Sequence, residues 1–111
     1  MFRSIDLIVD SQGAPLAAYQ VELRAVVREA KIVGIEGGEH PAFRVPPFYD
    51  PQALQRERVI LAAFSTRDGD ALPKGRTKVA TVHYQAPSEL PVRFIVQAST
   101  GATVGAKKLR I

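Results

Sequence analysis

Four residues that could bind a metal ion lie around one glycine-containing loop: Glu36, Glu39, His40 and Asp50. A histidine with carboxylates nearby could ligate a divalent cation. However, no two of these residues have the spacing of a known metal motif, such as two histidines separated by three residues. The pattern favours solvated residues that cap the loop, and a metal site made by these four residues is the minor alternative.

Two other places in the chain resemble fragments of functional motifs. Asp68-Gly69-Asp70 looks like part of a calcium-binding loop, but the other ligands and the closing glutamate are missing, so a turn is expected. His83 lies in an alternating stretch with no cysteine or serine motif that would make it a catalytic base. With no acid–base pair or nucleophile constellation, we expect no enzyme activity and no cofactor.

Aromatic residues lie among four prolines in the segment Pro41–Pro51. Each proline fixes φ and removes a backbone donor, so this segment cannot be an interior strand. If Phe43, Phe48 and Tyr49 are exposed, they are rigid anchors for a protein or a sugar ring. If they are buried, they cover an open side of the domain. These three residues are the candidate partner-binding site.

Composition limits the functional classes further. The 111 residues fit one domain over 1–111, and 46% hydrophobic with 23% charged residues argues against disorder. The absence of cysteine excludes disulfides and cysteine metal sites. A net charge of +4 without a dense basic, aromatic patch predicts no nucleic-acid partner. No apolar run approaches the roughly 20 residues that span a bilayer.

The elements that must position these residues show the period of two that is typical of half-buried strands. A helix is the competing interpretation for Tyr19–Val27, because Ala, Leu, Glu and Arg favour helices. Helical spacing would place Arg24 on the apolar face, so we favour a strand. Alternation is present in Ser4–Val9, Tyr19–Val27, Lys78–Gln85 and Val92–Ala98, and two further strands are expected at Lys31–Glu36 and, after a turn, at Thr103–Ile111.

The run Val59–Ser65 is apolar at nearly every position, which predicts a strand covered on both faces, with Leu61 buried between two sheets. Asp50 followed by Pro51 has the form of a helix start and predicts one short helical turn. Together these signals predict an all-β fold, a two-sheet antiparallel β-sandwich of about seven strands. It carries one long Pro-rich loop with at most one short helical turn.

Four segments in chain order resemble those of a cohesin domain, the jelly-roll β-sandwich of bacterial scaffolding proteins. They are the alternating strand Leu16–Leu23, the segment Tyr49-Asp50-Pro51 with Leu54, the apolar strand Val59–Ser65, and the strand Val79–Tyr84 after a loop with glycines. The resemblance covers most of the chain as a pattern. It implies a cohesin-like fold and a role in binding a partner protein.

Two functions are therefore expected as alternatives. The first is a non-catalytic interaction module, cohesin-like, that binds a protein or carbohydrate partner in an extracellular or cell-envelope assembly. The second is a structural, self-associating β-sandwich subunit of a surface assembly. A monomer in light scattering would count against the second.

Overall fold

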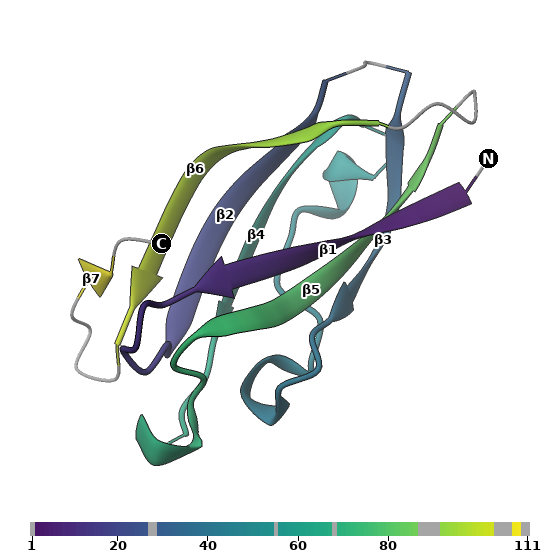
Figure 1. Ribbon diagram of the computed structural model, residues 1–111. Coiled ribbons are helices and arrows are strands. Elements are labelled where there is room, and N and C mark those ends of the chain that lie inside the picture. Colours follow the sequence, from purple (N-terminus) through teal and green to yellow (C-terminus); the bar gives the residue numbers. More distant parts are fainter. Residues whose placement is uncertain are drawn as a thin grey trace.

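Two antiparallel sheets make up the computed structural model, which describes residues 2–26, 29–54, 56–67, 69–86, 92–103 and 108–109. The first sheet has the order β1-β5-β3, with β1 (Phe2–Asp10), β3 (Lys31–Gly37) and β5 (Arg76–Gln85). The second has the order β4-β2-β6-β7, with β2 (Ala18–Ala25), β4 (Arg58–Phe64), β6 (Phe94–Ala102) and β7 (Lys108–Leu109). The sheets face each other (Figure 1), which confirms the predicted two-sheet β-sandwich.

The chain alternates between the two sheets from β1 to β6. Strands β1, β3 and β5 belong to the three-stranded sheet, whereas β2, β4 and β6 belong to the four-stranded sheet. Each connection in this part of the chain therefore crosses from one layer to the other. The crossing places the loop between β3 and β4 beside the outer edge of β4.

The core lies between the sheets and follows the predicted alternation. In β2, Tyr19, Val21 and Leu23 are buried, and Gln20 between them is exposed. This pattern confirms a strand for this segment, because a helix would not separate odd from even positions. The largest fully buried side chains come from both sheets and from the loop before β2: Leu16, Ile32, Val59, Leu61, Val79 and Val82.

Strand β4 differs from the prediction in one respect. Leu61 is fully buried, as expected, but β4 is an edge strand and its outer face is open. Ile60 is 46% exposed and Phe64 is 65% exposed. The prediction that both faces are covered is therefore wrong. Apolar residues on both faces of a strand show that neither face carries charged side chains. They do not show that other parts of the same chain cover both faces.

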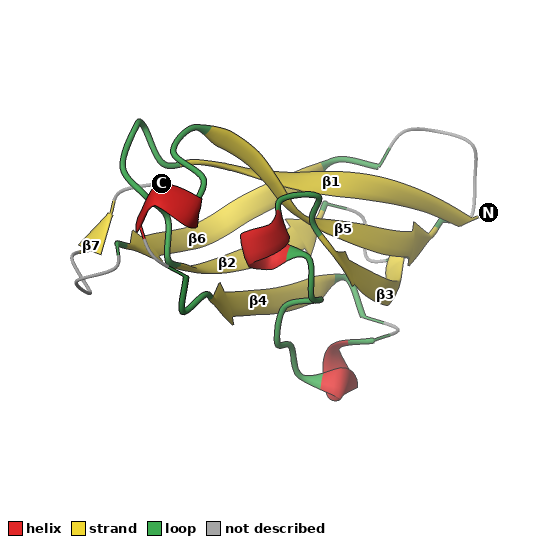
Figure 2. Ribbon diagram, turned by 90° about the horizontal axis from the view of Figure 1, so that it is seen from below, coloured by secondary structure: helices red, strands yellow, loops and turns green. Residues whose placement is uncertain are grey.

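Three short 3₁₀ turns lie in the loops that join the strands (Figure 2). Two of them belong to the Pro-rich loop, which is one more than expected there. The expected turn, Pro51–Ala53, is present, and Asp50 caps it because its Oδ1 accepts a hydrogen bond from the Gln52 amide at 2.9 Å. The other two are Pro41–Phe43 and Gly69–Ala71. Among the described residues, no helix has the length and apolar character needed to cross a membrane.

Two glycines hold the Pro-rich loop close to the first sheet. A Cβ atom on Gly37 would collide with the carbonyl oxygen of Arg44, and one on Gly38 with that of Lys78. The Gly38 amide donates to the Phe43 carbonyl at 2.8 Å. These approaches are possible only without a side chain, so the glycine pair fixes the loop against the core.

Some predicted features lie outside the described residues. They are the end of the second strand at Val27, Asp68 of the possible calcium-loop fragment, and the segments 104–107 and 110–111 of the last predicted strand.

Candidate functional site

The aromatic residues of the Pro-rich loop have three different environments. Phe43 is 2% exposed and packs edge-on against Tyr19, with ring centroids 5.4 Å apart. It is a core residue and cannot contact a partner directly. Tyr49 is half-buried against the core, whereas Phe48 is 69% exposed. Of the three candidate residues, Phe48 alone presents most of its ring to solvent.

Phe48 is held in place by backbone pairing with the edge of β4. Its amide donates to the Ala62 carbonyl at 2.7 Å, and the Ala62 amide donates back to the Phe48 carbonyl at 3.0 Å. Its ring stacks on that of Phe64, with centroids 6.3 Å apart and an angle of 14° between the planes. Two exposed phenylalanines, one from the loop and one from the strand, therefore form a rigid pair.

A shallow cleft of about 300 Å³ lies beside this pair, on the outer face of the four-stranded sheet. The register sets Ala18 of β2 between Phe64 of β4 and Ala102 of β6. Small side chains in this row leave the phenylalanine rings standing above the sheet. The cleft is mostly apolar, and its lining includes Ala18, Gln20, Phe48, Ala62, Phe64 and Thr100.

Sequence reasoning missed Phe64 as a site residue. The signal was present, because in a strand Phe64 must share a face with Ile60 and point away from Leu61. With β4 interpreted as covered on both sides, this outward aromatic was assigned to the core.

A second pocket, of about 330 Å³, lies at the opposite end of β4. Arg58 and Ile60 reach it from the outer face of the strand, and Arg24 reaches it from β2. The loop before β4 closes its far side. The charged residues that line it are Arg24, Asp50, Arg56, Glu57 and Arg58. The outer face is thus apolar at one end and rich in arginine at the other.

The hydrogen bonds around this pocket involve one acidic side chain of the sheet. Glu22 Oε2 lies 3.9 Å from Arg58 Nη1. With its amide turned so that both of its groups are satisfied, Gln97 donates to Glu22 Oε2 at 2.6 Å and accepts from Arg24 Nε at 3.0 Å. The orientations of Arg24 and Glu22 are therefore linked through Gln97.

In the structure, the four candidate metal ligands make separate contacts. Glu36 Oε1 lies 3.1 Å from Nε2 of His83 on the neighbouring strand, and Glu39 Oε1 lies 3.7 Å from Lys78 Nζ. His40 Nδ1 accepts from the Ala42 amide at 3.0 Å, which caps the turn Pro41–Phe43. Asp50 caps the next turn. Within the described ranges, no three histidine or acidic side chains gather in a way that could hold a metal ion.

Comparison with known proteins identifies the fold. No protein-family model matches the sequence, and no curated protein matches it. The structure is similar to a non-cellulosomal cohesin from the archaeon Archaeoglobus fulgidus, with a TM-score of 0.69 and 7% identity, over 98% of this chain and 72% of that one. It is also similar to the cohesin of the type I cohesin–dockerin complex Coh-OlpC–Doc435 from Clostridium thermocellum, with a TM-score of 0.66 and 14% identity, over 97% and 76%. The chain has a cohesin-like fold, as the sequence pattern indicated.

Proposed function

We propose that this chain is a protein-interaction module that binds its partner through the outer face of the four-stranded sheet. The observation that carries the proposal is the stacked, exposed pair Phe48 and Phe64 beside an apolar cleft. Exposed apolar patches on soluble proteins mark interaction sites, and aromatic side chains dominate the binding energy of such sites. The small residues of the cleft floor leave room for a partner side chain between the ring pair and the sheet.

The fold supports a protein as the partner. One of the similar structures is a cohesin in complex with a dockerin, so a domain of this fold binds another protein there. The low identity transfers no individual contact to this chain. A carbohydrate ligand and an extracellular or cell-envelope setting stay predictions that rest on the sequence resemblance alone. We further propose that residues 1–111 form one non-catalytic domain.

Affinity capture with matched variants tests this proposal. The wild type, Phe48→Ser, Phe64→Ser and the control Phe2→Ser are immobilised and exposed to proteins of the source organism. Phe2 suits the control because it is 73% exposed on the other sheet. A protein retained by the wild type and Phe2→Ser, but lost from Phe64→Ser, is then titrated by calorimetry. We expect binding to weaken by about 30-fold or more, as for an aromatic hot spot of at least about 2 kcal/mol. A partner whose affinity is unchanged in both cleft variants contradicts the proposal.

Self-association is the alternative that the same surface favours, because a second copy could cover the two phenylalanine rings. Light scattering separates the two functions. We expect a monomer for the wild type, and a dimer that Phe64→Ser converts to a monomer would instead support the structural subunit.

A further inference from the structure

Three arginines converge at one end of the proposed interaction face. The β2–β4 register sets Arg24 directly opposite Arg58, and Arg56 lines the same pocket of about 330 Å³. Like charges directly opposite each other on neighbouring strands destabilise a sheet. Glu22, 3.9 Å from Arg58, offsets this repulsion only in part.

The backbone beneath these arginines is fixed by hydrogen bonds to two other strands. The Arg56 carbonyl accepts from the Ile32 amide at 2.8 Å, and the Glu57 carbonyl accepts from the Ala25 amide at 2.8 Å. The Arg56 amide in turn donates to the Ala53 carbonyl at 3.1 Å. A ligand that binds at this pocket finds the arginine backbones already in position, which lowers the entropy cost of binding.

The protein satisfies only part of the hydrogen-bonding capacity of these guanidinium groups. Glu22 lies 3.9 Å from Arg58, which is longer than a direct hydrogen bond. Arg24 uses its Nε towards Gln97, which leaves its terminal nitrogens for other acceptors. In the described part of the chain, neither Arg24 nor Arg56 forms an ion pair. A planar guanidinium group with free terminal nitrogens is well suited to bind a carboxylate through two parallel hydrogen bonds.

We infer that this arginine pocket binds an aspartate or glutamate side chain of the partner protein, an inference that rests on the proposed function. Phe64 and Arg58 stand at the two ends of β4 on the same face, with Ile60 and Ala62 between them. At about 3.3 Å per strand residue, Phe64 and Arg58 are about 20 Å apart along β4. The partner segment therefore has an apolar side chain at one end and an acidic one about 20 Å away, a length of roughly 13 helical residues.

The charges around the pocket favour a carboxylate over a phosphate. Asp50 and Glu57 line the pocket together with the arginines, and Glu22 lies beside it. These three carboxylates balance the three arginines, so the pocket has no excess of positive charge for a phosphate group that carries nearly two negative charges. The planar guanidinium groups suit a singly charged carboxylate, which they can bind through two parallel hydrogen bonds.

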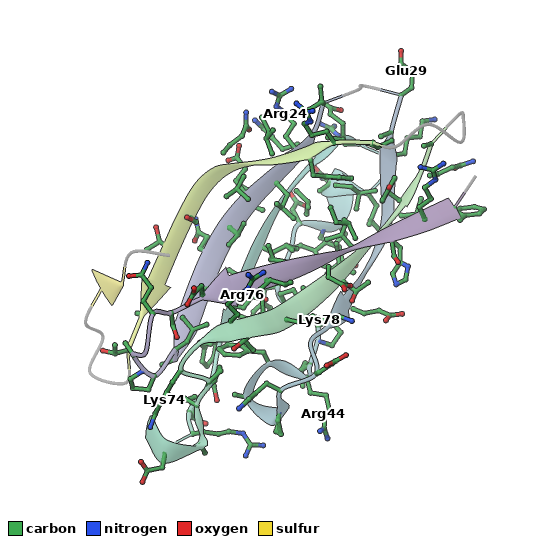
Figure 3. All side chains as sticks on the ribbon, viewed as in Figure 1. Arg24, Glu29, Arg44, Lys74, Arg76 and Lys78 are labelled. Atoms are coloured by element: carbon green, nitrogen blue, oxygen red, sulfur yellow. The ribbon has the colours of Figure 1, made fainter. Side chains whose placement is uncertain are left out.

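A small-molecule titration tests the pocket without any partner. N-acetylglutamate α-amide is added to ¹⁵N-labelled protein, and the Nε–Hε signals of the arginines are followed by NMR. The matched glutamine compound and inorganic phosphate are titrated in parallel. Variants Arg24→Gln and Arg58→Gln remove one guanidinium group each. The control Arg76→Gln removes an arginine from β5 of the other sheet, and Figure 3 shows Arg76 well away from Arg24.

We expect saturable shifts of the Arg24 and Arg58 signals with the glutamate compound and none with its glutamine analogue. Either pocket variant should weaken binding at least about fivefold, by loss of a charge-assisted hydrogen bond, and Arg76→Gln should leave it unchanged. Absence of saturation, equal binding by Arg24→Gln, or tighter binding of phosphate would each overturn the inference.

Phe64→Ser should still bind the glutamate compound. If the glutamate compound does not bind but Phe64→Ser still loses the partner protein, the arginine pocket is refuted and the proposed function stands. If the glutamate compound binds but Phe64→Ser keeps the partner protein, the proposed function is refuted instead.

Discussion

Tyr19 places a hydroxyl group inside the core. Its side chain is 3% exposed, and within the described residues the hydroxyl oxygen has no hydrogen-bond partner. Burial raises the pKa of Tyr19 well above its ordinary value of 10.0, because the charged form would lose its hydration. Its ring packs edge-on against Phe43, so the aromatic contact is what this position contributes to stability.

Tyr19→Phe should therefore keep the packing and remove the buried hydroxyl. We expect the free energy of unfolding at neutral pH to stay equal or to rise by about 1 kcal/mol. The raised pKa also means that, above pH 10, Tyr19 ionises in the unfolded chain but not in the folded one. The free energy of unfolding that Tyr19 contributes is fully present below the pKa of the unfolded chain and decreases as the pH rises above it. Tyr19→Phe has no group that ionises here, so its free energy of unfolding should fall less above pH 10 than that of the wild type. Urea unfolding near neutral pH and above pH 10 measures both effects. A clear loss of stability at neutral pH would mean that the hydroxyl has a partner.

Neighbouring residues of β4 offer a second comparison at this scale. Leu61 is fully buried, whereas Ile60 beside it is 46% exposed. We expect Leu61→Ala to lower the free energy of unfolding by about 2–5 kcal/mol, because it removes buried methyl groups and leaves a cavity. Ile60→Ala, a substitution of similar size, should cost less than about 1 kcal/mol. Denaturant melts of the two variants are the measurement, and equal losses would contradict the assignment of the inner and outer faces.

Among the elements, the outer edge of β4 is paired with the Pro-rich loop at one residue. Backbone amides two residues apart in a strand point the same way, so the amides of Ile60, Ala62 and Phe64 all face this edge. Only Ala62 among these three donates to the loop, through Phe48. Prolines around Phe48 prevent the loop from pairing further. The edge is therefore closed at its centre and open on either side.

Hydrogen exchange should show this pattern directly. We expect the Ala62 amide to exchange at least about tenfold more slowly than those of Ile60 and Phe64, since protection follows from a stable hydrogen bond. Exchange followed by two-dimensional NMR at neutral pH resolves the three amides. Similar rates for all three would mean that the bridge to Phe48 opens readily.

The sequence predicts an element well where polar and apolar residues separate by face. Strand β2 was predictable because Gln20, Glu22 and Arg24 all fall on one side. Strand β4 was predictable as a strand with Leu61 buried, but its edge position was not. Between Arg58 and Phe64 the outer face of β4 carries no polar residue that would have indicated exposure to solvent. This is the face through which we propose that a partner binds.

The candidate site was predictable only in part, for a similar reason. Phe48 stood out by its position among prolines, but its contact with Phe64 depends on a bridge between the loop and β4. The arginine pocket was not predictable, because Arg24 and Arg58 are distant in sequence and meet only through the strand register. Phe43 resembled Phe48 in sequence, yet the turn Pro41–Phe43 directs it into the core.

For the whole molecule, the exposed phenylalanine pair should control the behaviour of the free protein. We expect the double variant Phe48→Ser/Phe64→Ser to bind an environment-sensitive apolar dye more weakly than the wild type and to be more soluble. Its melting temperature should stay within about 3 °C, because both rings are largely exposed. Dye fluorescence and calorimetry measure the two quantities, with Phe2→Ser as the control. Unchanged dye binding in the double variant would show that the apolar surface lies elsewhere.

The alternation of the chain between the two sheets also affects the order in which the strands can pair during synthesis. Because β1 pairs with β5, Phe2 meets its partner Gln85 only after most of the chain exists. Strands β2 and β4 can pair earlier, but β1 has no partner strand until then. At about 5–20 residues per second, the ribosome takes roughly 4–17 s to synthesise the intervening chain. During that time β1, with Ile5, Leu7 and Val9, has no neighbouring strand, so we expect the three-stranded sheet to form only when β5 joins β1 and β3.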